Sequence, residues 1–199
     1  DKVLWGILKP HLEVLFVLTK RYTCVVANPP YMGQKSMNGD LKEYVNEVYP
    51  LSKSDLFAVF MEVCLHLNIK KGLMGMINQH SWMFLSSYEK LREEILNKYS
   101  IINMLHLGLR TFEELSGEVV QSTAFVLKKG KDIQHGTYHR LVEYRNNLEK
   151  ERTFLNKSNI YVSISQKKFS RIQSSPIAYW VSNKRFESFK AELKLDDAI

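Results

Sequence analysis

The sequence predicts an α/β fold in which a mostly parallel sheet carries helices on both of its faces. Short apolar runs, typical of buried strands, alternate with longer stretches whose apolar residues recur at helical spacing. A loop alone separates the last two of these runs, so the sheet can close with an antiparallel pair. The four predicted strands span residues 22–27, 73–78, 101–107 and 120–127.

The predicted helices follow from apolar spacing and from residues that favour helix ends. A helix over residues 55–68 is capped by Asp55 or by a serine just before it, and Lys70-Lys71-Gly72 closes it. The apolar stretch over residues 3–18 is interrupted by charged residues and a proline, which excludes a membrane span and favours a helix packed on the sheet. Two further helices are predicted over residues 41–48 and about 86–98.

The size of the chain sets limits on its domain organisation. Its 199 residues, 45% of them hydrophobic, are enough for one globular core or for one domain with part of another. The pattern weakens after Gly130, so we expect a boundary near residues 130–136 that divides residues 1–130 from an extension over 131–199. In this extension we expect strands near 138–144 and 160–164, and helices near 146–155 and 184–193.

The net charge of +7 is concentrated at one end of the chain. Residues 1–127 carry 13 basic and 13 acidic side chains, whereas residues 128–199 carry 15 basic and 8 acidic ones. A basic segment with interleaved aromatic rings suits a polyanion such as DNA, although an ordinary solvated surface explains the charge equally well. The aromatic residues of this segment are Tyr138, Tyr144, Phe154, Tyr161, Phe169, Tyr179, Trp180, Phe186 and Phe189.

The two cysteines indicate a reducing compartment. Cys24 lies in a predicted strand and Cys64 in a predicted helix, so we expect two free, buried thiols, as in cytoplasmic proteins. The six histidines form no pair at the spacing of metal ligands, and we expect no metal site. His80 lies next to a candidate site, where a structural role is the simpler interpretation.

Asn28-Pro29-Pro30-Tyr31 directly follows the first predicted strand. Two consecutive prolines cannot continue a strand, because each lacks a backbone N–H and has a fixed φ. The strand therefore ends in a stiff loop that presents an amide, a carbonyl and an aromatic ring at the carboxyl edge of the sheet, where ligands bind in open α/β folds. An ordinary proline turn is the alternative, but chance gives this pattern only on the order of a few times per thousand such chains.

Asn-Pro-Pro-Tyr after an apolar strand resembles the catalytic motif of amino-group methyltransferases that use S-adenosyl-L-methionine. The resemblance implies that the Asn28 side-chain oxygen and the Pro29 carbonyl, which Pro30 holds in place, accept the two hydrogens of an adenine amino group. These acceptors localise the nitrogen lone pair and stabilise the charge that develops there. Tyr31 would stack on the base after it leaves the duplex, a contact worth ~1–3 kcal/mol.

The resemblance continues downstream of this motif. Residues 55–62, 71–77, 80–82 and 120–124 resemble, in order, blocks of the gamma class of adenine-specific DNA methyltransferases. This class implies a partial Rossmann-like class I methyltransferase sheet over residues 1–130, which would be the catalytic half. A basic extension or the start of a DNA target-recognition region would follow over 131–199. In relatives, an aromatic residue at the position of Phe112 helps to hold the flipped base, and one at the position of Phe60 contacts the cofactor adenine.

A narrower resemblance concerns residues 22–27, Met32-Gly33 and 175–182, which look like the methyltransferases of BREX-type phage-resistance systems. It implies a site-specific adenine DNA-methyltransferase of a bacterial restriction-modification or phage-defence system, located in the cytoplasm. Double-stranded DNA and the rest of a longer polypeptide would be its partners, with no membrane.

Plain packing is an alternative interpretation of several aromatic residues. Phe60 recurs with three aliphatic residues at helical spacing, which favours a place in the core. Trp82 and Phe84 are expected in the core or in the wall of a groove. Tyr179 and Trp180 are expected to anchor the C-terminal segment, with stacking on nucleic acid as the alternative.

The cofactor motif of the resembled class is missing from the sequence. That motif needs a glycine-rich turn after an earlier strand and an acidic residue at the end of the next strand. Only about twenty residues precede the catalytic strand, and they contain no Gly-x-Gly. We therefore expect a piece of a longer enzyme that by itself binds S-adenosylmethionine weakly or not at all and is inactive.

Two other functions remain open at this point. Enzymes that methylate a glutamine amide, and some RNA guanine methyltransferases, share Asn-Pro-Pro-Tyr, because an amide nitrogen is an equally poor nucleophile. A non-catalytic DNA-binding subunit with a methyltransferase-like fold is the third possibility.

Overall fold

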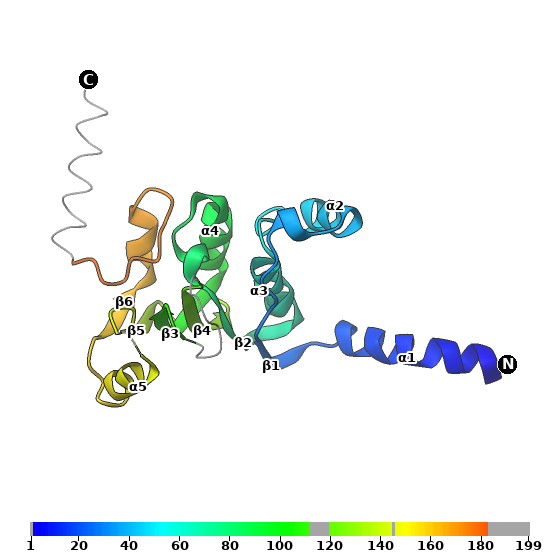
Figure 1. The fold of residues 1–199 in the computed structure, drawn as a ribbon, viewed down its shortest axis with the longest axis horizontal. Helices are drawn as coiled ribbons and strands as arrows, with labels where there is room; N and C mark the ends of the chain where they lie inside the picture. Colours follow the sequence, from blue (N-terminus) through cyan, green and yellow to red (C-terminus); the bar gives the residue numbers. More distant parts are fainter. Residues whose placement is uncertain (1, 112–119, 145, 183–199) are drawn as a thin grey trace, which may run out of the picture.

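A computed structural model describes residues 2–111, 120–144 and 146–182, and Figure 1 shows the arrangement of its elements. Phe112, Phe186, Phe189 and the helix predicted over residues 184–193 lie outside the described residues. The helices are α1 (Lys2–Thr19), α2 (Gly39–Val48), α3 (Leu56–Leu67), α4 (Glu89–Lys98) and α5 (Asn147–Leu155). The strands are β1 (Tyr22–Ala27), β2 (Asn68–Gln79), β3 (Tyr99–Gly108), β4 (Ser122–Lys129), β5 (His135–Arg140) and β6 (Ile160–Ser165).

The six strands form one sheet in the order β1-β2-β4-β3-β5-β6. β1 pairs in parallel with β2, and β3 with β5, whereas β4 runs antiparallel to both of its neighbours and β6 antiparallel to β5. Four strands therefore share one direction, and the predicted antiparallel pair of β3 and β4 is confirmed. Because β1 and β2 are adjacent and parallel, their carboxyl ends, Ala27 and Gln79, lie at the same edge of the sheet.

The core lies between the sheet and the helices α3 and α4, which cover one face (Figure 1). Side chains from both layers are completely buried there, among them Phe57, Met61, Ile95, Met74 and Met104. Burial of apolar area on this scale is the main stabilising force in a domain of this size.

α3 ends at Leu67 and β2 begins at the next residue, so the prediction that Lys70-Lys71-Gly72 closes the helix was wrong. These residues lie in β2. Gly72 suits this position, because a Cβ atom would lie 3.0 Å from Ile69 O and 3.1 Å from the backbone oxygens of Tyr22 and Thr23. The carbonyl groups at the end of α3 are bound instead by Lys129, whose Nζ donates to Leu65 O at 2.9 Å.

α1 is helical as predicted, but the expectation that it packs on the sheet was wrong. It has no buried residue and extends away from the rest of the chain (Figure 1). β1 is an edge strand, so only one side of it is paired, and Cys24 is exposed rather than buried. Cys64, on the core face of α3, is a buried free thiol as predicted.

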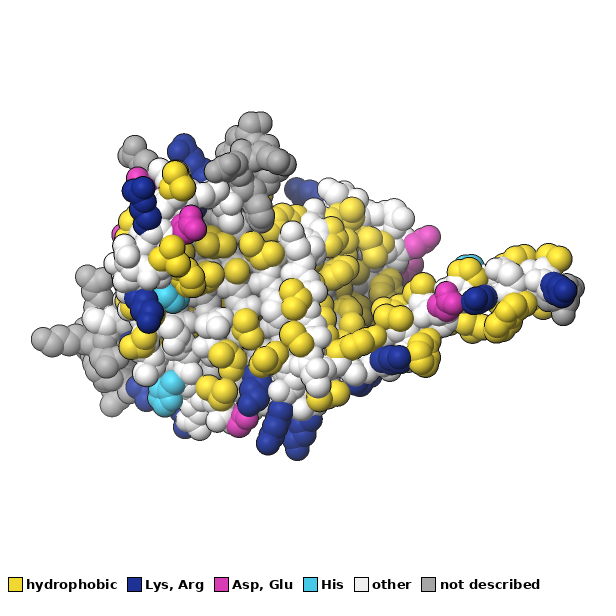
Figure 2. All heavy atoms as spheres, turned by 90° about the horizontal axis from the view of Figure 1, so that it is seen from below, with side chains coloured by type: hydrophobic (Ala, Val, Ile, Leu, Met, Phe, Trp, Pro, Cys, Tyr) yellow, Lys and Arg dark blue, Asp and Glu magenta, His cyan; other side chains and the backbone are white. Residues whose placement is uncertain are grey.

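The second face of the sheet carries an open, largely apolar hollow of about 430 Å³ (Figure 2). It is lined from four strands by Val26, Ile77, Leu105, Ala124 and Val126, with Asn28 at its rim on the carboxyl side of β1. Val26 is 77% exposed, which is unusual for an aliphatic side chain in a sheet.

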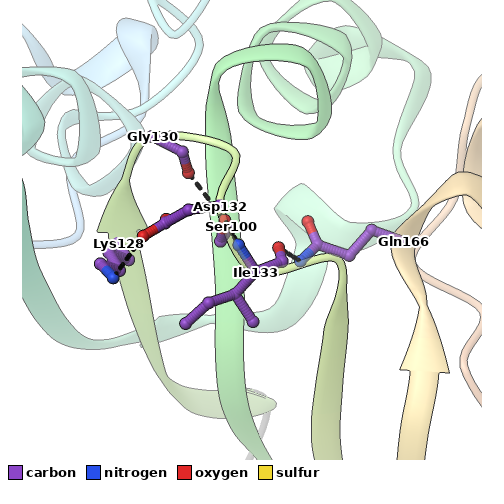
Figure 3. Close-up of polar contacts among 6 residues, drawn as sticks. All are labelled: Ser100, Lys128, Gly130, Asp132, Ile133 and Gln166. Atoms are coloured by element: carbon purple, nitrogen blue, oxygen red, sulfur yellow. Dashed lines mark hydrogen bonds and ion pairs between the residues drawn. The ribbon is translucent and has the colours of Figure 1, made fainter.

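The extension after β4 begins by lengthening the same sheet, because β5 pairs with β3. Polar contacts hold the intervening turn (Figure 3): Ser100 Oγ donates to Gly130 O at 2.7 Å and accepts from Ile133 N at 3.3 Å. The Lys128–Asp132 ion pair and the Gln166 amide, which donates to Ile133 O, complete the turn. The division at residue 130 stays a prediction.

Several aromatic and basic side chains of this extension make contacts within the chain. Tyr138, Phe169 and Tyr179 are buried, so for these three rings a role in stacking on DNA is excluded. Lys131, Lys150 and Lys168 each donate to a backbone carbonyl, as does Lys129 at the end of β4, and burial lowers the pKa of all four. In the ranges that the structure describes, no helix has both the length and the apolar character needed to cross a bilayer.

Candidate active site

The catalytic candidates lie where β1 ends, as predicted. β1 stops at Ala27, and the next residue, Asn28, is exposed and lines the hollow on the open face. Pro29 is buried, whereas Pro30 is exposed, so the loop passes from the core to the surface between these two residues. The Asn28 amide is thus accessible to a molecule that approaches the carboxyl edge of the sheet.

Tyr31 is held against the core by its ring. The ring meets Phe57 edge to face, with centroids 6.0 Å apart and an interplanar angle of 81°. The Tyr31 hydroxyl is buried and forms no hydrogen bond with any described residue. Burial raises the Tyr31 pKa, so the phenol is neutral at physiological pH.

Asp55 caps α3, as the sequence predicts, with Oδ1 accepting from Phe57 N at 3.2 Å. It therefore belongs to the same helix turn as the residue against which Tyr31 packs. The predicted helix cap and the predicted catalytic loop are brought together in space.

Phe60 does not lie in the core, so the packing interpretation of this residue was wrong. Its side chain is 36% exposed, whereas Phe57, Ala58 and Met61 are buried. An exposed ring on α3 is available to a planar ligand. Trp82, by contrast, is fully buried and packs on Phe125 with centroids 5.0 Å apart, which confirms its predicted place in the core.

A second group of side chains lies at the same sheet edge and was missed by the sequence analysis. His80, which follows β2, and His106, near the end of β3, share a hydrogen bond of 2.8 Å between Nδ1 and Nε2. His106 Nδ1 is 3.1 Å from the Tyr179 hydroxyl. Burial lowers the His80 pKa; for His106, burial together with the charges of His80 and Arg140 lowers the pKa to about 3. Nothing in the spacing of these residues could have indicated that they meet.

Tyr179 anchors the C-terminal segment, as predicted. Its ring stacks on Tyr138 at 4.7 Å and meets the Trp180 ring edge to face at 5.0 Å. The Arg140 guanidinium lies 4.5 Å from the centroid of Trp180, a cation–π contact. This anchoring brings the residues after β6 to the carboxyl edge of β2 and β3.

Comparison with known proteins agrees with this geometry. Residues 7–112 match the family described as Eco57I restriction-modification methylase. The chain is 49% identical over 177 residues to the adenine-specific methyltransferase PglX of Lacticaseibacillus casei (strain Zhang) and 45% identical over 184 residues to the adenine-specific methyltransferase BrxX of Escherichia coli O9:H4 (strain HS). These matches cover 85% and 90% of the chain but only 15% of each relative. They confirm the resemblance to adenine-specific methyltransferases and to the BREX subgroup.

The fold is also found in a solved structure. The methyltransferase subunit of a type I restriction-modification system from Streptococcus thermophilus superposes with a TM-score of 0.57 at 14% identity, over 79% of this chain and 37% of that one. At this identity the likeness concerns the fold alone, and it supports the predicted methyltransferase sheet. The family match spans more than half of the residues and includes the whole Asn-Pro-Pro-Tyr loop. The chain therefore belongs to the Eco57I restriction-modification methylase family.

Proposed function

We propose that this chain is the catalytic half of a DNA adenine-N6 methyltransferase that acts in restriction-modification or phage defence. The observation that carries the proposal is the placement of Asn28, exposed at the carboxyl end of β1 beside a Tyr31 ring fixed on Phe57. An accessible amide oxygen next to a rigid aromatic face is what a flipped base with an exocyclic amino group requires.

In the proposed reaction the chain supplies acceptors and a stacking surface. The Asn28 side-chain oxygen and the Pro29 carbonyl accept the two hydrogens of the adenine amino group, so its lone pair faces the methyl donor. Methyl transfer would place positive charge on the nitrogen, and the same two oxygens would stabilise that charge. The methylated nitrogen would then release one proton to solvent water, and no covalent intermediate with the protein would form.

S-adenosylmethionine, when bound, supplies the methyl group on a positively charged sulfur. Within this chain Phe60 is the residue that fits it, because its exposed ring on α3 can stack on the cofactor adenine. The sequence offers no glycine-rich turn for the rest of the molecule, so we propose that other parts of the full-length protein complete the cofactor site.

Double-stranded DNA is the proposed substrate and the remainder of the parent polypeptide the proposed partner, in a bacterial cytoplasm. The adenine-specific relatives, each much longer than this chain, support both proposals. Basic side chains of the extension that bind no carbonyl group are the candidates for phosphate contacts.

The decisive experiment measures 6-methyladenine formation by the full-length protein with duplex DNA, and with RNA and protein acceptors in parallel. We expect methylation of DNA alone. Asn28→Ala should reduce the rate by at least about 100-fold, since it removes one of two acceptors at the reacting nitrogen. Tyr31→Phe should stay close to the wild-type rate, because the ring is kept and the hydroxyl makes no hydrogen bond with described residues. Full activity of Asn28→Ala, or methylation of RNA or protein instead, would contradict the proposal.

A further inference from the structure

One carboxylate oxygen joins the catalytic loop to helix α3. Asp55 Oδ1 accepts a hydrogen bond from Phe57 N at 3.2 Å, the usual helix cap, and a second one from Met32 N at 2.9 Å. Met32 directly follows Tyr31, and it lies 23 residues before Asp55. The second bond is therefore a contact of tertiary structure that capping does not require.

Backbone hydrogen bonds reinforce this contact on both sides. Leu56 N donates to Met32 O at 3.0 Å, and Gln34 N donates to Ser54 O at 3.2 Å. Gly33 and Asp55 form an antiparallel bridge between them. Residues 32–34 are thus paired with residues 54–56, with the Asp55 side chain at the end nearest Tyr31.

The same helix turn also holds the Tyr31 ring. Phe57 is completely buried and meets Tyr31 at 6.0 Å and Tyr88 at 5.7 Å between ring centroids. The backbone on the C-terminal side of Tyr31 and the ring of Tyr31 are therefore both tied to the N-terminus of α3. On the N-terminal side the two prolines restrict φ, but they leave the torsions after Tyr31 free.

We propose that Asp55 is a positioning residue for methyl transfer, holding Tyr31 and, through it, the Asn28–Pro30 loop in the orientation that receives the flipped base. The expected effect on methyl transfer rests on the proposed function, whereas the expected effect on the loop does not. Asp55 would touch neither base nor cofactor; it would act through Met32 N alone. A displacement of about 1 Å in a reacting group can cost roughly 100-fold in rate, so a contact that removes this freedom has a measurable effect.

Four variants of the full-length protein separate positioning from capping. Asp55→Asn keeps the oxygen that accepts both hydrogen bonds. Asp55→Ser keeps a residue type favoured at helix caps, but its side chain is one bond shorter and loses the reach to Met32 N. Asp55→Ala removes both contacts. Asn146→Ala, at the cap of α5, where Asn146 accepts from Glu149 N at 2.9 Å, is the control for loss of a cap elsewhere.

Two measurements are made on each variant: kcat and KM for DNA methylation, and hydrogen exchange by mass spectrometry in peptides covering residues 28–36. Asp55→Ala and Asp55→Ser should lower kcat by about 10- to 100-fold with little change in KM for the cofactor, and should speed exchange in 28–36. Asp55→Asn should stay within about twofold of wild type in both measurements, and Asn146→Ala should leave both unchanged.

Wild-type exchange in residues 28–36 of Asp55→Ala, or a wild-type kcat for that variant, would overturn the inference. Equal effects of Asn146→Ala would overturn it too, because they would show a general loss of stability. If the wild-type protein methylates no DNA, the proposed function fails, and the exchange data still decide whether Asp55 holds the loop.

Discussion

The imidazoles of His80 and His106 share a hydrogen bond of 2.8 Å at the carboxyl edge of the sheet, and His106 is only 3% exposed. His80 follows β2, and His106 lies near the end of β3, although β4 separates these two strands in the sheet. The His106 ring is neutral in the folded protein, because a buried imidazolium beside His80 and Arg140 would be poorly solvated and repelled.

Acid should therefore destabilise the protein through His106. Its pKa is about 3 when folded and about 6.5 when unfolded, so between these values the unfolded state binds the proton first. The contribution of His106 is complete above pH 6.5 and is lost as the pH falls toward 3, by about 1.4 kcal/mol per pH unit. Urea denaturation of the wild type and of His106→Asn at pH 7, 6, 5 and 4 should show a shallower pH dependence in the variant.

The exposed His135 provides the control for that experiment. His135→Asn should follow the wild-type dependence on pH. If His106→Asn also follows it, the ring is not held neutral in the folded protein.

Loss of the Lys129 ammonium should destabilise the fold. Nζ donates to Leu65 O at 2.9 Å and to Asn68 O at 2.8 Å, carbonyls at the end of α3 that have no partner within the helix. Lys129→Met keeps most of the aliphatic chain but removes both of these hydrogen bonds, which should lower the free energy of unfolding by about 1.5–3 kcal/mol. Chemical denaturation measures this, with the exposed Lys167→Met as the control.

The same pair of variants tests which of these lysines contact DNA phosphates. We expect Lys129→Met to leave the salt dependence of DNA binding by the full-length protein unchanged. The Lys129 ammonium group is held by the carbonyl oxygens of Leu65 and Asn68, so we do not expect it to reach a phosphate. A slope that falls by about one unit for Lys129→Met would mean that this lysine contacts a phosphate.

Residues 1–199 alone should bind S-adenosylmethionine weakly or not at all. The chain offers the Phe60 ring but no glycine-rich turn for the rest of the cofactor. Isothermal titration of the chain and of the full-length protein, side by side, checks this. Micromolar binding to residues 1–199 would refute the prediction and would mean that Phe60 and the carboxyl edge of the sheet suffice.

Local chemistry explains which predictions the structure confirms. The end of β1 at Ala27 follows from two prolines that cannot extend a strand, and the cap at Asp55 follows from a side chain that accepts the free N–H groups of a helix start. Both depend on residues that are close in sequence. The alternation of strands and helices depends likewise on short periodic runs.

Most of the wrong predictions concern which face of an element is buried. α3 is apolar on almost every side, so periodicity could not show that Phe57 faces the core while Phe60 faces outward. Cys24 looked buried because its strand is apolar, yet β1 lies at the sheet edge and much of it is exposed. Whether an apolar surface is covered depends on neighbouring elements, which no local pattern describes.

By itself, the sequence determined the order of the elements and the position of the Asn-Pro-Pro-Tyr loop at the end of a strand, since torsional limits and apolar periodicity act over a few residues. Only the tertiary structure decided that Asp55 binds Met32, that His80 meets His106, and that Lys129 closes α3. These contacts join residues 23 to 64 positions apart. They exist because packing of the sheet against α3 and α4 brings the separate strand ends and helix ends to the same edges.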